Sequence, residues 1–200
     1  LRFPLEFAGF AGSRREAEME VEGPPVLGPL HPYQRAIADK VRGLLDPAAS
    51  KNRGLLSLPT GAGKTRVAVQ ALVEHIEQSL EDVRIIWLAE TDELCEQAIQ
   101  TWSLVWRSEG RAGTPLTLSR LWASNEPEER DGHQVVVASL AKLDSVVNRN
   151  GGNWQEQYGW LQHPAVIILS ENARRDLFAE PPAIAPKGRA TAPKKSAAGR

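Results

Sequence analysis

One segment, residues 56 to 76, limits the possible folds more than any other: LSLPTGAGKTRVAVQALVEHI. An apolar run leads into a turn that contains Gly61 and Gly63, and a helical pattern follows. The apolar positions of that pattern recur every three or four residues, at Val67, Ala71, Leu72 and Ile76. A strand, a tight loop and a helix in this order predict one repeating unit of an α/β sheet.

The same segment carries chemistry for binding phosphate. Glycines let backbone N–H groups turn inward at a helix N-terminus, a lysine reaches the β- and γ-phosphates, and a threonine hydroxyl ligates Mg²⁺. This is the Walker A pattern, although Leu58 stands where the strict pattern has glycine. It predicts ATP and Mg²⁺ as ligands, with Lys64 also catalytic and Thr65 also a metal ligand. The predicted nucleotide contacts in the loop are Thr60, Gly61, Ala62, Gly63, Lys64 and Thr65.

Short apolar runs alternate with longer helical patterns through the middle of the chain, which predicts a mainly parallel sheet with flanking helices. Residues 1–28 mix charges with a Gly-Pro-Pro turn and are expected to form an arm. Residues 29–173 are expected to form the α/β domain. Residues 174–200, rich in Ala, Pro, Lys and Arg, are expected to be a disordered basic tail. The predicted strands are 55–58, 83–89, 116–122, 134–139 and 165–169.

Composition excludes several classes of protein. Cys95 is the single cysteine, so the chain can form neither an internal disulfide nor a cysteine-based zinc cluster, and we expect a cytoplasmic setting. No apolar run approaches the roughly 20 residues that cross a bilayer, so no membrane partner is expected. The net charge is −1, yet residues 174–200 hold seven Lys or Arg against two Asp or Glu. Nucleic acid would therefore meet the body in a local groove rather than on a basic face.

Residues 29–173 resemble the first RecA-like motor domain of superfamily 2 helicases and translocases. The likeness is greatest to the DNA-directed branch that includes type III restriction motors. It rests on the Walker A segment together with LHPYQRAI at 30–37, RIIWLAETDELCEQA at 84–98 and QVVVASLAKL at 134–143. It implies a RecA-like P-loop NTPase fold, ATP-driven movement on nucleic acid, with DNA as the expected substrate, and a second RecA-like domain that these 200 residues do not contain.

The resemblance assigns roles to individual residues. Gln34 stands where relatives read the adenine edge, and Thr91 where they meet the phosphates of a bound strand. Asp92 occupies a position where many relatives carry arginine, so we assign it to capping a helix. Ser139 and Lys142 match a second phosphate-contacting motif. Two of these residues have an ordinary structural alternative: Gln34 as a surface polar residue, and Ser139 as a helix cap.

The apolar run VIIL at 166–169 precedes the weakest match. Relatives follow this strand with Asp-Glu-Ala-His, whereas this chain has Ser170, Glu171, Asn172 and Ala173. Glu171 is retained at the place of the water-orienting carboxylate, and it is our second candidate catalytic residue. Ser170 replaces the metal-holding aspartate and, being neutral, is a weak candidate ligand for Mg²⁺. Glu171 could equally be a solvated charge at the end of a strand.

Two main hypotheses therefore stand after the sequence. In the first, the chain is a working motor domain that closes against a second RecA-like domain, whose arginine fingers complete the site. In the second, it is a truncated or degenerate fragment that binds nucleotide without turnover. A small-molecule kinase is a third option, against which the nucleic-acid motifs speak. Of the six tryptophans, Trp87, Trp102 and Trp106 are predicted to lie in the core, and the other three remain open.

Overall fold

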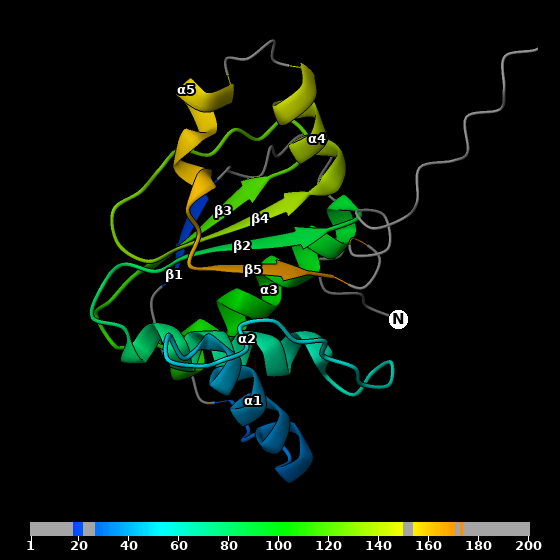
Figure 1. Ribbon diagram of the computed structural model, residues 1–200, viewed down its shortest axis with the longest axis vertical. Coiled ribbons are helices and arrows are strands. Elements are labelled where there is room, and N and C mark those ends of the chain that lie inside the picture. Colours follow the sequence, from blue (N-terminus) through cyan, green and yellow to red (C-terminus); the bar gives the residue numbers. More distant parts are fainter. Residues whose placement is uncertain (1–17, 22–26, 150–153, 171–172, 174–200) are drawn as a thin grey trace, which may run out of the picture.

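The chain forms a sheet covered by helices on both faces (Figure 1). A computed structural model describes residues 18–21, 27–149, 154–170 and 173. Within these residues the strands lie in the order β1-β3-β4-β2-β5. β3, β4, β2 and β5 are parallel, and β1 pairs with β3 in the antiparallel sense. The strands are β1 (Glu18–Val21), β2 (Arg84–Ala89), β3 (Leu116–Leu121), β4 (Gln134–Ser139) and β5 (Val166–Leu169).

The helices divide between the two faces of the sheet (Figure 1). α2 and α3 cover one face, and α1 packs against α2 outside them. α4, α5 and the 3₁₀ helix η2 cover the other face. The helices are α1 (Pro32–Leu45), α2 (Lys64–Gln78), α3 (Asp92–Glu109), α4 (Leu140–Arg149), α5 (Trp154–Tyr158) and η2 (Gly159–Gln162).

The apolar run of β2 explains why both faces are covered. Successive side chains of a strand point to opposite faces. Ile85 and Trp87 belong to the core beneath α2 and α3, whereas Ile86 and Leu88 belong to the core beneath α4 and α5. A strand that is apolar at every position is stable only if both of its faces are buried, which is the usual condition of parallel sheets. The predicted α/β class with a mainly parallel sheet is thus confirmed.

Four predicted strands agree with the structure to within one residue at each end, and the fifth is wrong. Residues 55–58 were expected to be the strand before the glycine loop, but they pair with no strand in the described sheet. Leu55 is 72% exposed. Leu56 and Leu58 are partly buried, the first against the α2–α3 core and the second between α1 and α2. The apolar residues of this segment therefore pack against helices at Leu56 and Leu58 and do not form a strand.

The first 28 residues contain more structure than the predicted arm. Glu18–Val21 forms β1, with Val21 opposite Leu116 and Glu18 opposite Ser119. The sequence signal for this strand is a four-residue alternation of glutamate with an apolar residue. The rest of the arm up to residue 26 and the tail 174–200 lie outside the described residues.

The predicted core tryptophans are confirmed. Trp102 and Trp106 are fully buried on α3, and Trp87 lies edge to face with Trp102, with ring centroids 6.4 Å apart. Trp122, left open by the sequence, is also buried, at the end of β3. None of these four rings is available to stack on a base.

In the described part of the chain, no helix combines the length and the apolar character that crossing a membrane requires.

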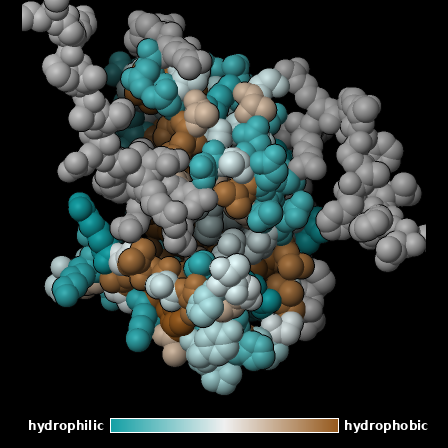
Figure 2. Space-filling model, turned by 90° about the vertical axis from the view of Figure 1, so that its right-hand side faces the viewer, coloured by the Kyte–Doolittle hydropathy of each residue, from teal (hydrophilic) through white to brown (hydrophobic). Residues whose placement is uncertain are grey.

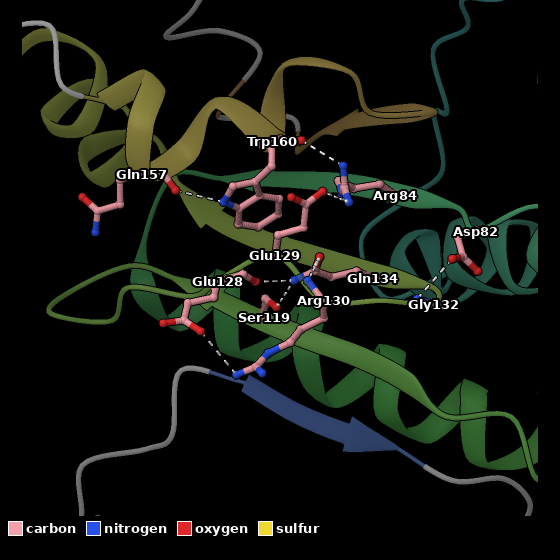
Figure 3. A network of polar contacts seen from close by, with 10 residues as sticks. All are labelled: Asp82, Arg84, Ser119, Glu128, Glu129, Arg130, Gly132, Gln134, Gln157 and Trp160. Carbon is pink, nitrogen blue, oxygen red and sulfur yellow. Dashed lines mark hydrogen bonds and ion pairs between the residues drawn. The ribbon is translucent and has the colours of Figure 1, made fainter.

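A polar network lies at the end of the sheet where the parallel strands begin (Figure 3). Gln134 is fully buried there, and its amide nitrogen donates to the Ser119 hydroxyl and to the Glu128 carbonyl, both at 2.9 Å. Its amide oxygen accepts from the Arg130 backbone N–H at 3.2 Å. The connection from β3 to β4 is thereby held against the strand that it enters.

Arg84 ties the other covering layer to the same edge. Its guanidinium donates to the Trp160 carbonyl at 2.9 Å and pairs with Glu129 at 2.6 Å (Figure 3). The charge also lies 5.3 Å from the centre of the Trp160 ring, within the range of a cation–π contact. These contacts lie where the parallel strands begin. The opposite end of the sheet, where the strands finish, is called here the free edge, and it is the end at which α/β sheets bind ligands.

Candidate nucleotide-binding site

The loop before α2 has the backbone that its glycines predict. Gly61 and Gly63 have φ angles of 79° and 83°, a region that side chains other than glycine rarely adopt. Between them, the Ala62 N–H donates to the Pro59 carbonyl at 3.1 Å and closes a tight turn. The loop lies on the side of the sheet where β2, β4 and β5 end (Figure 1). Thr60 and Gly61 are exposed at its outer surface.

The helix that follows begins without a side-chain cap. Gly63 is the N-cap of α2 and has no side chain with which to cap it, and the first turn contains no acidic residue. The backbone N–H groups at a helix start and the helix dipole both favour an anion. The residues present thus fit the phosphate groups of a nucleotide.

Lys64 and Thr65 occupy the first two positions of α2, and both are partly buried. The Lys64 ammonium folds back over the loop and donates to the Leu58 carbonyl at 3.0 Å. A bound triphosphate would be a stronger acceptor for this cation than a neutral carbonyl is. Leu58, which departs from the strict motif, therefore contributes a backbone group that holds the lysine over the loop.

Gln34 lies against the loop, but its amide is already engaged. Its nitrogen donates to the Ala62 carbonyl at 3.0 Å, and its oxygen accepts from the His31 N–H at 2.9 Å. The side chain is 9% exposed. A Cβ added at Gly63 would lie 2.8 Å from the Gln34 amide nitrogen, so the loop needs glycine there for space as well as for φ. The structure brings Gln34 to the predicted nucleotide site and gives it two internal partners.

The predicted nucleic-acid contacts lie at the carboxyl ends of the strands. Thr91 follows β2 and is exposed, and its hydroxyl accepts from the Leu94 N–H at 3.3 Å as the N-cap of α3. Ser139 ends β4 directly beside Ala89 of β2. Thr91 and Ser139 thus come from the ends of neighbouring strands.

The side chains of Ser139 and Lys142 are largely buried, whereas a phosphate contact requires an accessible side chain. Ser139 is 3% exposed, and its hydroxyl accepts from the Lys142 N–H at 3.3 Å, which is the capping alternative for this residue. The Lys142 side chain is 15% exposed, and its ammonium lies 3.9 Å from a carboxylate oxygen of Glu126. To meet a phosphate, Lys142 would have to exchange this partner.

The N-terminus of α3 is acidic, in contrast to that of α2. Asp92 and Glu93 lie exposed in its first turn. Hydrogen bonds from its own backbone N–H and from the Thr91 hydroxyl lower the pKa of Glu93. Two carboxylates stabilise a helix start but repel a phosphate. Of these two helix starts, α2 is therefore the one suited to an anion.

The end of β5 supplies no strong metal ligand in the described residues. The Ser170 N–H donates to the Leu88 carbonyl at 2.9 Å, and its hydroxyl accepts from the Ala173 N–H at 3.4 Å. Glu171 lies outside the described residues. Within the part of the chain that the structure describes, no three His, Cys, Asp or Glu side chains gather as metal ligands. Among the described residues of the loop and of the end of β5, the Thr65 hydroxyl is the ligand that fits Mg²⁺ held with a nucleotide.

Cys95 takes no part in this chemistry. It is fully buried on α3, and burial, with the nearby carboxylates of α3 as smaller contributors, raises the pKa of its thiol to about 12. Such a thiol is protonated at neutral pH and is a poor nucleophile.

Sequence reasoning missed a charged cluster between α1 and α2. Glu74 of α2 contacts Arg35 and Arg42 of α1, which are distant in sequence. A single glutamate on a helix gives no signal of such partners. The spacing of the two arginines by seven residues, which places them on one face of α1, was the available hint.

The free edge of the sheet is seen from its own side in Figure 2. Hydrophilic and hydrophobic residues intermix over the visible surface between the grey atoms.

The two loop glycines give a matched pair of tests. Gly61→Ala meets open space and should cost only backbone strain, about 1 kcal/mol of unfolding free energy. Gly63→Ala should cost more, about 2–3 kcal/mol, because the new methyl group also displaces Gln34. Urea unfolding of both variants measures the difference. Equal losses would show that the close approach of Gln34 to Gly63 does not matter.

Comparisons with known proteins agree with this geometry. Residues 28–171 match the family model described as "Type III restriction enzyme, res subunit". A curated relative, ATP-dependent DNA helicase Hel308 of Methanocaldococcus jannaschii, is 25% identical over 146 residues, which are 71% of this chain. The aligned region is 11% of that relative, so the chain spans a small part of its length. No solved structure matches the chain significantly.

The family match covers the described sheet from α1 to the end of β5, together with the glycine loop and α2. It includes all the residues to which the sequence assigned a role. The chain therefore belongs to the family of the type III restriction enzyme res subunit and carries its helicase-like, ATP-binding motor domain.

Proposed function

We propose that this domain binds ATP and, in the full-length protein, couples ATP hydrolysis to movement on DNA or to its unwinding. The observation that carries the proposal is the start of α2. It is uncapped, it follows two left-handed glycines, and Lys64 folds over it. An anion with several oxygens satisfies all three features at once.

The roles at the nucleotide follow from position. Residues 60–65 bind the phosphates, with the Lys64 ammonium leaving the Leu58 carbonyl for the β- and γ-oxygens. Mg²⁺, when bound with the nucleotide, would neutralise phosphate charge, and the Thr65 hydroxyl is its ligand from this loop. Gln34 serves the adenine side, where base contact exchanges the hydrogen bond that its amide oxygen accepts from the His31 N–H. Glu171 orients the attacking water.

Nucleic acid is proposed to lie along the carboxyl ends of β2 and β4, against Thr91, Ser139 and Lys142. Residues at neighbouring strand ends lie close enough together to contact phosphates of the same nucleic-acid strand. Such contacts do not depend on the base sequence. DNA is proposed as the substrate because the curated relative is named a DNA helicase. A second RecA-like domain would close over the nucleotide and supply arginine to the transferred phosphate. We place this activity in the cytoplasm.

A second candidate function is nucleotide binding without turnover. One observation favours it: the Ser170 hydroxyl, at the place where relatives hold the metal with aspartate, is neutral and accepts from the Ala173 N–H. Tested by itself, the chain should therefore bind ATP and hydrolyse it poorly.

Lys64→Ala tests the nucleotide site. Loss of a charged hydrogen-bond donor to the phosphates should weaken ATP binding about 10- to 100-fold. Isothermal titration calorimetry measures the affinity. Lys40→Ala, which removes an exposed lysine of α1, is the control for charge and should leave the affinity unchanged. Equal affinity of the Lys64→Ala variant and the wild type would refute the assignment of the loop.

Ser170→Asp tests the choice between the two candidates. Aspartate can still accept from the Ala173 N–H, and it adds the carboxylate that Mg²⁺ prefers. With DNA and a second RecA-like domain supplied, steady-state ATPase activity should rise at least about tenfold. Ser170→Asn, which is similar in shape but neutral, is the control and should stay at the basal rate. No rise for the aspartate variant would favour binding without turnover.

A further inference from the structure

We propose that Glu74 is a positioning residue of the nucleotide site. It fixes α1 against α2, so that Gln34 of α1 holds the phosphate-binding loop through the Ala62 carbonyl. This inference rests on the proposed function, and it assigns a role to a residue that lies outside the loop itself.

The Glu74 carboxylate is divided between two arginines of α1. One oxygen lies 2.5 Å from the Arg35 guanidinium, and the other lies 3.0 Å from that of Arg42. The Gln70 amide adds a hydrogen bond of 3.3 Å to the first oxygen. The Glu74 side chain is 18% exposed, so both oxygens are held inside the α1–α2 contact rather than in open solvent.

The carboxylate remains ionised in this position. Burial acts to raise the pKa of Glu74, but the hydrogen bonds from Arg35, Arg42 and Gln70 together outweigh it, and the pKa is lowered. The arginine side chains are 44% and 38% exposed, so the ion pairs themselves contribute little to stability. Their contribution is geometric, because one charge is held at two points of α1.

Those two points define the rotation of α1. Arg35 and Arg42 are seven residues apart, which is two helical turns, so both project from the same face. A helix held by one carboxylate at both turns can neither roll about its axis nor slide along its neighbour without losing a contact. Without Glu74, the two guanidinium groups would have no shared partner on α2.

The apolar contact between α1 and α2 has a small fully buried centre. Ala38 is the fully buried apolar residue of α1 in this contact, and it meets Val67 and Ala71 of α2. Leu30, Ile37, Val41 and Leu58 are partly buried around them, and Leu45 is partly buried against the core of α2 and α3. Such packing favours the contact without fixing one direction, whereas the polar clamp sets the orientation of α1.

The orientation of α1 decides whether Gln34 reaches the loop. Gln34 precedes Arg35 directly, and its amide lies 3.0 Å from the Ala62 carbonyl, in the space that Gly63 leaves open. Glu74 itself cannot touch a phosphate, since ten residues of helix place it about 15 Å along α2 from Lys64. Its effect on the loop therefore passes through α1 and Gln34.

The experiment compares two ligands and a double-mutant cycle. Isothermal titration calorimetry gives the affinities for ATP and for inorganic tripolyphosphate, which has no base. The proteins are the wild type, Glu74→Ala, Gln34→Ala and the double variant. Glu77→Ala is the matched control, because Glu77 lies on the same helix and pairs with Arg111 instead of with α1.

We expect Glu74→Ala to weaken both ligands about fivefold and to add nothing further once Gln34 is alanine. Glu77→Ala should leave both affinities unchanged. If Glu74→Ala does not fold, Glu74→Gln, which keeps the shape and removes the charge, should give the same pattern. Because tripolyphosphate has no base, weaker binding of this ligand shows an effect on the phosphate-binding loop and not on the contact with adenine.

Three results would overturn the role of Glu74. The first is a lower unfolding temperature with unchanged affinities, which a purely structural residue would give. The second is an equal loss in the presence and absence of Gln34, and the third is a loss with ATP alone. Failure of the wild type to bind ATP would instead overturn the proposed function, so the two failures are distinguishable.

Discussion

Burial of β3, β4 and β2 on both faces is the constraint on which the rest of the structure depends. β3 and β4 are buried at every position, and β2 is buried at all but its first residue. Such strands require helices above and below, and crossover connections then bring their carboxyl ends to one edge. Polar contacts of Gln134 and Arg84 close the opposite edge. We therefore expect the chemistry at the carboxyl ends of the strands and at the loop beside them.

At the carboxyl ends of the strands, the turns and helix starts differ in whether a side-chain hydroxyl caps them. The hydroxyls of Thr91, Ser139 and Ser170 each accept from a backbone N–H three residues later, and so they satisfy the turns that follow the strands. α2 has no such cap and begins with a left-handed glycine. A hydroxyl cap is a self-sufficient helix start, whereas the start of α2 is suited to an anion.

Much of the fold could be predicted because β2 and β4 are continuous apolar runs with clear turns around them. The strand expected at 55–58 failed because apolar residues also pack against helices, and no pairing partner can be read from four letters. β1 was missed because a four-residue alternation is too short a signal. Most predicted site residues come to one edge, but the sequence could not show that Gln34 and Lys142 already have partners, since their partners are 28 and 16 residues away.

Every role proposed for this domain depends on ATP binding at the loop before α2. The most direct test is a titration of the ¹⁵N-labelled chain with ATP and Mg²⁺, followed through its backbone amide resonances. The largest shifts should occur at Gly61, Gly63, Lys64 and Thr65, and Gln34 should respond with them. Shifts centred on another part of the chain, or no shifts at millimolar ATP, would contradict ATP binding at this loop.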